Sequence, residues 1–276
     1  MIEATFRPRG PYRLRHMRPS GAWSAPLPSG GDAVARQLPD GRVHVLAPSD
    51  EGVELARFML ALDDDTSEFH RRFARDPLLG ASARAFVGYR TLRRATVAHA
   101  ALRAVCGQLI EARRAIALER RITRATGERV PSQAALARFA PAELRRLGLG
   151  MQRASALVRL CRTVDLERLK AVPSTAVEQR LCRERGIGPW SLGLIALEGL
   201  GRYDRGLVGD LALVKLQSSL HGRWVEGWET AELLAPYDEW QGLAGKVLLI
   251  GWANGLVPGA DGDVARLLQQ RARRAA

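Results

Sequence analysis

The sequence predicts a mostly α-helical protein with a small α+β region at its N-terminus. Residues 1 to about 48 are rich in Gly, Pro and Ser and contain short apolar runs separated by turn signals. From about residue 78 onward, apolar residues recur at the three- and four-residue intervals of an amphipathic helix. The 276 residues, 46% of them hydrophobic, are enough for a full core in one large domain or two moderate ones.

The N-terminal region is predicted to hold a small sheet followed by two helices. P-S-G, P-S-G-G and P-D-G turns separate the expected strands, which are Glu3–Phe6, Tyr12–Met17 and Val43–Ala47. Ser49 can cap a helix through Leu62, and the run Asp63-Asp64-Asp65-Thr66 ends it and starts another through Phe73. This run is not an EF-hand loop, because Glu68 stands where the loop requires Gly. We therefore expect an α+β domain over 1–75 and an all-helical domain over 76–276.

The helical domain is predicted element by element from the apolar period. A first helix carries Ala98, Ala101, Leu102, Val105, Leu109 and Ile110 on one face. Further helices are expected at Ala115–Thr126, Ser132–Ala140, Pro141–Leu147, Gln152–Thr163, Asp165–Ala171, Thr175–Arg185, Pro189–Leu200, Asp210–Leu220, Glu229–Leu234 and Leu243–Trp252.

The chain is strongly basic. Its net charge is +13, and 39 of its 42 basic residues are arginines, since only three are lysines. This composition favours a polyanionic partner such as nucleic acid, but the base composition of a genome can also raise the proportion of arginine. The terminal arginines, such as Arg271, Arg273 and Arg274, are also compatible with a solvated tail.

Several functional classes lack support. Cys106, Cys161 and Cys182 are odd in number and far apart, which argues against disulfides and favours a cytoplasmic protein. No apolar run reaches the length of a membrane span, and the N-terminus does not read as a secretory signal. The five histidines are isolated, so we expect no metal site. Neither a G-x-S-x-G motif nor a G-K-S/T phosphate loop is present.

The most informative segment is Gly186-Ile187-Gly188-Pro189-Trp190. Two glycines flanking one aliphatic residue allow a sharp turn with exposed amides, and Pro189 suits the first position of the next helix. Such a turn can bind a phosphate. Taken alone, it could equally be a plain connection between two helices.

Asp210 is the candidate for chemistry. A buried carboxylate can stabilise positive charge that develops on a substrate, and it can orient an attacking water. The local alternative is structural, because Asp in G-D-L-A-L-V-K is also a good N-cap whose charge suits the helix dipole. The two roles are compatible.

Taken together, these pieces resemble the helix-hairpin-helix DNA glycosylase superfamily and, within it, the alkylation-repair 3-methyladenine DNA glycosylase II family. The resemblance spans about residues 95–255. It rests on Ala101–Ile110, Leu147–Leu157, the hairpin with Trp190-Ser191, Asp210 at 22 residues after Gly188, and Leu248–Trp252. The sheet-then-helices layout of residues 1–75 also resembles that family's N-terminal region.

The resemblance implies a fold, an activity and a set of roles. Gly186 and Gly188, with Arg185 and Gln108 beside them, would bind the DNA backbone, and carbonyls at the hairpin are a possible monovalent cation site. Leu109 would be the wedge that fills the space left by a flipped base. Trp190 and Trp252 would stack on that base, and an aromatic wall suits alkylated bases because many are cationic. Apart from the possible cation, no cofactor is expected.

The position two residues after Gly188 carries a Lys in the bifunctional relatives, whereas this chain has Trp190. Because no amine is present there to form a Schiff base, the resemblance implies hydrolysis that leaves an abasic site. The dispersed cysteines also exclude an endonuclease III type iron–sulfur cluster.

The chain departs from the family pattern at three positions. The pocket Tyr four residues after the tryptophan is Leu194, a Trp-Arg pair is replaced by Leu243-Ala244, and the usual hairpin Pro is Arg185. These departures affect the substrate-binding positions and leave the range of bases open.

The predicted function is therefore a monofunctional DNA glycosylase that removes alkylated purines of the 3-methyladenine type from damaged double-stranded DNA in base excision repair. Two alternatives stay open. One is a non-catalytic helix-hairpin-helix DNA-binding protein, and the other keeps the fold but acts on deaminated or oxidised bases. We expect neither a membrane nor an obligate protein partner.

Overall fold

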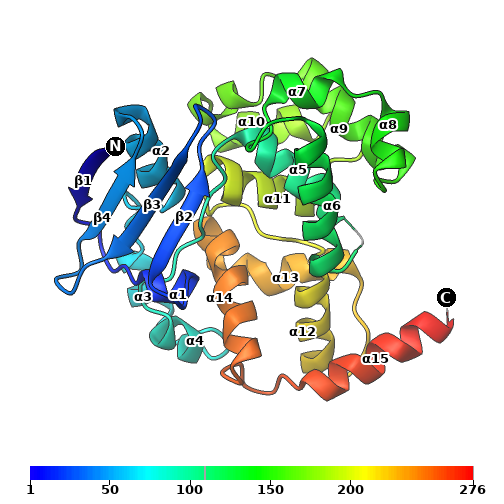
Figure 1. Ribbon diagram of the computed structural model, residues 1–276. Coiled ribbons are helices and arrows are strands. Elements are labelled where there is room, and N and C mark those ends of the chain that lie inside the picture. The colour runs from blue at the N-terminus through cyan, green and yellow to red at the C-terminus, as the bar shows by residue number, and fades with distance from the viewer. Residues whose placement is uncertain (109, 276) are drawn as a thin grey trace.

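The structure is a computed structural model that describes residues 1–108 and 110–275. A small antiparallel sheet with covering helices forms the N-terminal part, and a larger assembly of helices forms the rest (Figure 1). This arrangement confirms the predicted fold class.

The sheet has four strands in the order β1-β4-β3-β2, all antiparallel. Their bounds are β1 (Ile2–Phe6), β2 (Ala22–Pro26), β3 (Asp32–Gln37) and β4 (Val43–Ala47). The buried face of β4 carries Val43, Val45 and Ala47, and α2 (Asp50–Met59) packs on the sheet. Ser49 caps α2 as predicted, since its hydroxyl accepts a hydrogen bond from the Gly52 amide at 3.2 Å.

The prediction of a strand at Tyr12–Met17 is wrong. That segment contains a helical turn, α1 (Leu14–Met17), and the amide of Leu14 donates to the side-chain oxygen of Gln37 at 2.9 Å. This long-range bond replaces a sheet partner, so the alternating apolar residues of the segment reach the core without strand pairing. The hairpin that does complete the sheet is formed by β2 and β3, whose small buried residues Ala33 and Ala35 gave a weak strand signal.

The rest of the chain is helical. The α-helices are α3 (Ser67–Phe73), α4 (Gly80–Ala85), α5 (Val97–Gly107), α6 (Ala112–Ala125), α7 (Gln133–Arg138), α8 (Pro141–Arg146), α9 (Met151–Thr163), α10 (Ser174–Leu181), α11 (Pro189–Leu194), α12 (Leu211–His221), α13 (Thr230–Leu234), α14 (Gln241–Ala253) and α15 (Gly262–Ala275). Short 3-10 or π segments are η1 (Glu167–Ala171), η2 (Ile195–Leu200), η3 (Gly227–Glu229) and η4 (Ala235–Trp240). Every helix predicted from the period has a counterpart, whereas α4, η4 and α15 were not expected.

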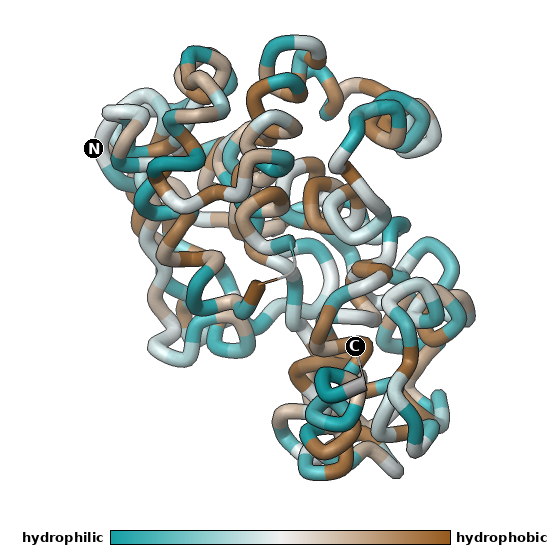
Figure 2. Tube along the Cα trace, turned by 90° about the vertical axis from the view of Figure 1, so that its right-hand side faces the viewer, coloured by the Kyte–Doolittle hydropathy of each residue, from teal (hydrophilic) through white to brown (hydrophobic). Residues whose placement is uncertain are grey.

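Two hydrophobic clusters form the core of the described residues. One lies between the sheet and α2 and includes Trp23 and Leu60, and the larger lies among the helices and begins with Phe69. Figure 2 shows hydrophobic segments concentrated on the interior helices and hydrophilic segments on the outer turns. No described helix is both long and apolar enough to cross a membrane.

Buried charges connect the two parts. Arg90 is fully buried and donates to the backbone carbonyls of Arg9, Pro11 and Ala61, and burial lowers the pKa of its guanidinium. Asp64, from the acidic run, accepts from Arg93 and from the Tyr203 hydroxyl at 2.6 Å. The acidic run thus serves as a turn and as an ion-pair partner, and no group of potential metal ligands occurs among the described residues.

Candidate active site

The turn between α10 and α11 has the backbone geometry that its glycines suggest. Gly186 has a φ of +96°, and a Cβ at this position would lie 2.8 Å from the Cβ of Ala156, so both conformation and space require glycine. Gly188 is exposed and extended and is the N-cap residue of α11, where Pro189 takes the first helical position. The first-turn amides of α11 have no carbonyl partner within the helix. The turn therefore presents backbone donors at an exposed loop.

Glu184 fixes this turn from behind. Its carboxylate is buried and accepts from Arg180 at 2.7 Å, from Arg159 at 3.2 Å and from the Thr163 hydroxyl at 3.2 Å. Burial alone would raise the pKa of Glu184, but these three hydrogen bonds outweigh it and lower that pKa below the usual 4.5. Arg159 also donates to the carbonyl of Arg185. The carboxylate thereby joins α9 and α10 to the first residues of the hairpin.

Gln108 connects the hairpin to the end of α5. Its side-chain amide donates to the carbonyl of Gly186 at 2.7 Å and to the hydroxyl of Ser191 at 2.8 Å. Arg153 donates to the backbone carbonyl of Gln108 at 2.9 Å. Gln108 therefore holds the hairpin rather than standing free in solvent. The next residue, Leu109, lies outside the described residues.

Trp190 and Asp210 are in direct contact. The indole Nε1–H of Trp190 donates to Oδ2 of Asp210 at 2.9 Å, and Oδ1 of Asp210 accepts from the amide of Ala212 at 2.9 Å. Asp210 is thus the N-cap of α12, as the sequence suggested, and its second carboxylate oxygen accepts the hydrogen bond from Trp190 of the hairpin helix. Each carboxylate oxygen has a further acceptor position, so the group can still orient a water or face a cation.

A close approach of α5 fixes the other end of the Trp190 ring. A Cβ on Gly107 would lie 2.5 Å from Cη2 of Trp190, which is closer than real Cβ atoms come to another heavy atom. Glycine at this position lets the indole lie against the backbone of α5. The ring is held at its nitrogen by Asp210 and at its far edge by Gly107.

Trp190 and Asp210 line a cavity of about 700 Å³. The start of α6, the start of α12, the loop after α12 and the C-terminal helix α15 form its other walls, through Ala112 and Ala115, Leu211, Trp224 and Arg273. In Figure 1, α12 and α15 lie against one another below α6. The cavity is large enough for a planar ligand beside a fixed carboxylate.

Arg103 of α5 also lines this cavity, and a buried acidic residue holds it from behind. Glu119 of α6 is 5% exposed and pairs with Arg103 at 3.5 Å, with Arg94 at 3.0 Å and with His99 at 2.9 Å. Burial would raise the pKa of Glu119, but the hydrogen bond from His99 and the charge of Arg94 lower it. The guanidinium of Arg103 keeps a buried nitrogen, Nη1, without a hydrogen-bond partner among the described residues.

Two predicted pocket residues are not brought to this cavity. Leu194 of α11 is 3% exposed and packs in the helical core, together with Leu243 and Ala244, so the family's Tyr and Trp-Arg positions are core positions here. Trp252 lies near the end of α14, where it packs against the same core, and it is not among the described residues that line the cavity. Leu194 is therefore a core residue, which corrects its predicted place in the pocket, whereas Trp252 is only half-buried and its role in base binding stays a prediction.

The structure adds cavity residues that the motifs did not indicate. Trp224 lies on the loop after α12, Lys215 lies one helical turn into α12, and Arg273 lies on α15. Arg273 was compatible with a solvated tail, yet α15 packs against α12 and supplies a wall. For Arg273, the sequence signal is the helical period of Val264, Leu267 and Leu268, which indicates that the C-terminal run is a helix.

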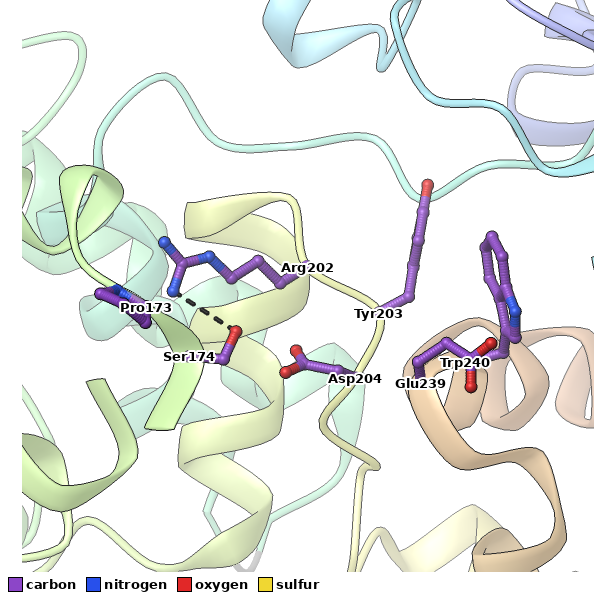
Figure 3. Close-up of a pocket in the computed structure, with 7 residues that line it drawn as sticks. All are labelled: Pro173, Ser174, Arg202, Tyr203, Asp204, Glu239 and Trp240. Atoms are coloured by element: carbon purple, nitrogen blue, oxygen red, sulfur yellow. Dashed lines mark hydrogen bonds between the residues drawn. The ribbon is translucent and has the colours of Figure 1, made fainter. Parts of the chain in front are cut away.

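Another depression is separate from this site. It has a volume of about 450 Å³ and is lined by Pro173, Ser174, Arg202, Tyr203, Asp204, Glu239 and Trp240 (Figure 3). Tyr203 and Trp240 stack with their centroids 5.8 Å apart, and Arg202 donates to the carbonyl of Val172 at 2.6 Å. It shares no lining residue with the Asp210 cavity.

Comparison with known proteins identifies the fold. The archaeal 3-methyladenine DNA glycosylase from Archaeoglobus fulgidus superposes with a TM-score of 0.74 at 17% identity, over 90% of this chain and 97% of that one. The 8-oxoguanine glycosylase/lyase of Clostridium acetobutylicum, solved with double-stranded DNA containing 8-oxoguanine, gives a TM-score of 0.68 at 16% identity over 92% and 99%. The chain has the helix-hairpin-helix DNA glycosylase fold. The fold predicted from the hairpin motifs is thus confirmed.

A sequence comparison agrees with this fold. The DNA-3-methyladenine glycosylase of Bacillus subtilis (strain 168) is 24% identical over 201 residues, and the match covers 66% of this chain and 66% of that protein. No family model matches the chain. Within this fold, Trp190 of the hairpin helix bonds directly to Asp210, and this contact is the basis for a functional proposal.

Proposed function

We propose that this protein is a DNA glycosylase that hydrolyses the N-glycosidic bond of alkylated purines in double-stranded DNA, in base excision repair. The observation that carries the proposal is the Asp210 carboxylate, which lies in the wall of a cavity of about 700 Å³ and is oriented by Trp190 of the hairpin helix. The curated relative and the archaeal structure, both named 3-methyladenine DNA glycosylases, support this substrate class.

The chemistry follows from the position of that carboxylate. When the bond between the sugar and the base breaks, positive charge develops on the sugar ring, and a fixed negative charge beside it lowers the barrier. Asp210 is oriented before the reaction, because the Trp190 indole and the Ala212 amide already hold its two oxygens. A water bound to a remaining acceptor position then adds to the sugar carbon, its proton is released, and the base leaves with the electron pair of the broken bond.

DNA binding in this proposal depends on the hairpin and its surroundings. Backbone amides at Gly186, Gly188 and Trp190 hold a phosphate, and the exposed Arg185 adds a charge beside it. Gln108 contributes indirectly, because it ties the hairpin to the residue proposed as the wedge, Leu109. Two structures with this fold, an 8-oxoguanine glycosylase/lyase and a yeast 3-methyladenine DNA glycosylase, are complexes with DNA, which supports this part of the proposal.

We propose a hydrolase without lyase activity, because Trp190 occupies the hairpin position at which bifunctional relatives carry an amine. Lys215 is the amine to consider against this, since it lines the same cavity from α12. Hydrolysis needs only water, so the proposal includes no organic cofactor. The carbonyl of Arg185 already accepts from Arg159, and that of Gly186 accepts from Gln108. A monovalent cation at the hairpin would therefore have to bind other carbonyls or share these two with their present donors.

The test is incubation of the protein with methylated duplex DNA, followed by chromatography of the released bases and by gels run with and without alkali. We expect 3-methyladenine release and strand breaks only after alkali. Binding without release from methylated, uracil or hypoxanthine DNA would refute the enzyme and favour the non-catalytic DNA-binding alternative. Strand cleavage without alkali, with borohydride trapping that depends on Lys215, would instead assign lyase activity.

A change of lesion is the second candidate, because an 8-oxoguanine glycosylase/lyase shares the fold at a TM-score of 0.68. Release of 8-oxoguanine but not of methylated purines in the same assay would favour it.

A further inference from the structure

We propose that Trp224 is the second aromatic wall of the base pocket, and that with Trp190 it selects planar, cationic bases. This inference rests on the proposed function and adds a specificity-determining residue to it. The assignment is made from the residues that line the cavity, which include Trp224 and do not include Trp252.

The placement of Trp224 is the first observation. Trp224 lies between α12 and η3, is half-buried, and lines the same cavity of about 700 Å³ as Trp190 and Asp210. No other aromatic residue is among the described residues that line this cavity. A base that enters beside Asp210 therefore meets aromatic surface from two separate segments of the chain.

The loop that carries Trp224 is held in place on both sides of the residue. On one side, Val225 donates its amide to the Ser218 hydroxyl of α12 at 3.0 Å. On the other, the carboxylate of Glu229 accepts from the Glu226 amide at 2.7 Å and from the Arg223 guanidinium at 3.1 Å. These contacts lower the pKa of Glu229 to about 2, the Arg223 hydrogen bond having the largest effect. The loop is thus ordered without a ligand.

A preorganised wall is useful to a base-binding site. Side chains that are already fixed lose little conformational entropy when the ligand binds. Trp190 is fixed by Asp210 and Gly107, and the backbone of Trp224 is fixed by the contacts to Ser218 and Glu229. The indole of Trp190 and the backbone that carries Trp224 therefore need little further ordering when a base binds.

The charges of the cavity determine which bases such walls favour. The lining residues include three cationic and three anionic side chains, Arg103, Lys215 and Arg273 against Glu111, Asp210 and Glu226, so their formal charges cancel. Net charge therefore does not exclude a cation, and the faces of tryptophan attract one more strongly than those of any other side chain. Purines methylated at a ring nitrogen, which carry a positive charge in DNA, fit this pocket better than neutral bases of the same shape.

The experiment compares two DNA duplexes that differ only in the presence of the base. One contains 7-methylguanine and the other a tetrahydrofuran abasic analogue. With Trp224→Ala, we expect kcat/KM on 7-methylguanine to fall roughly 5- to 150-fold, the range that base–aromatic stacking supports. The Kd for the abasic duplex should stay within about twofold. Trp224→Phe should recover most of the loss, which also shows that the loss is not a folding defect.

Trp228→Ala is the matched control, because Trp228 lies only four residues further on, in η3, but is 69% exposed and does not line the cavity. Trp228→Ala should leave the ratio between kcat/KM on the 7-methylguanine duplex and the Kd for the abasic duplex unchanged. A rise in the Kd for the abasic duplex as large as the fall in kcat/KM in Trp224→Ala, or a Phe variant no better than the Ala variant, would overturn the role of Trp224 while the proposed function stands. Wild-type protein that releases no base from any duplex would overturn both.

Discussion

Replacing Asp210 by Asn separates the chemical role of this residue from its structural role. Asp210 is both the N-cap of α12 and the carboxylate of the cavity, so most substitutions would remove both functions together. Asn is nearly the same size and is as good an N-cap as Asp. The substitution therefore removes the negative charge and leaves the start of α12 largely intact.

The structure sets the size of each effect. The Asp210 carboxylate accepts two hydrogen bonds, both 2.9 Å long, from Ala212 and Trp190, whereas an Asn amide has one oxygen and can satisfy only one of these donors well. Loss of one hydrogen bond costs about 1 kcal/mol of stability. By contrast, a unit charge about 4 Å from the developing cation at an effective dielectric of about 20 contributes about 4 kcal/mol, which corresponds to roughly a 10³-fold change in rate.

The assay is single-turnover release of base from methylated duplex, together with thermal unfolding and the Kd for abasic DNA. Asp210→Asn should lower the single-turnover rate roughly 10³-fold and the Tm by only about 2–4 °C, with abasic DNA bound as before. A rate within about tenfold of wild type would refute the electrostatic role of Asp210. A Tm fall large enough to unfold the protein at the assay temperature would show that the capping role dominates.

Three further predictions concern the contacts of Trp190 and of the hairpin. Trp190→Phe keeps a stacking ring but removes the donor to the carboxylate, so the single-turnover rate should fall roughly ten- to hundredfold, with abasic DNA binding unchanged. Gly107→Ala should reduce the free energy of unfolding in urea by about 1–3 kcal/mol, because the new methyl group collides with the indole. Gly188→Ala, whose Cβ would meet nothing within 4 Å, should leave that free energy nearly unchanged. Glu184→Gln should weaken DNA binding. Folding lowers the pKa of Glu184, so its carboxylate stabilises the folded protein fully above about pH 5 and less as the pH falls below that value. A Glu184→Gln variant whose stability to unfolding has the same pH dependence as the wild type would contradict this.

The hairpin and the cap could be predicted from the sequence because both depend on local conformation. Gly186 needs a positive φ and no Cβ, and Asp210 precedes the helix that it caps. Interactions over a few residues determine these features, so a short motif contains the information. The same reasoning explains why Ser49 was correctly placed at the start of α2.

The walls of the cavity depend on contacts between distant segments, which a local pattern does not encode. Trp224 and Arg273 come from a loop and a C-terminal helix that meet α5 and α6 only in the folded chain. Conversely, Trp252 and Leu194 match family positions in sequence, but Leu194 is buried in the core and Trp252 packs against it. The family motif gave the order of the elements correctly and one pocket position, Leu194, incorrectly.

The contacts also explain why a single position of the hairpin can determine the chemistry. Trp190 follows Gly188 of the hairpin turn by two residues and contacts Asp210 directly, so its side chain is fixed relative to both the proposed phosphate site and the carboxylate. An indole at this point can only donate to Asp210 and stack, which leaves the carboxylate to stabilise charge and to orient water. An amine at the same point would lie beside that carboxylate and could attack the sugar itself. In the proposed function, the residue that the turn and Asp210 both hold in place therefore favours hydrolysis, and Lys215 is the remaining amine in the cavity that the trapping experiment tests.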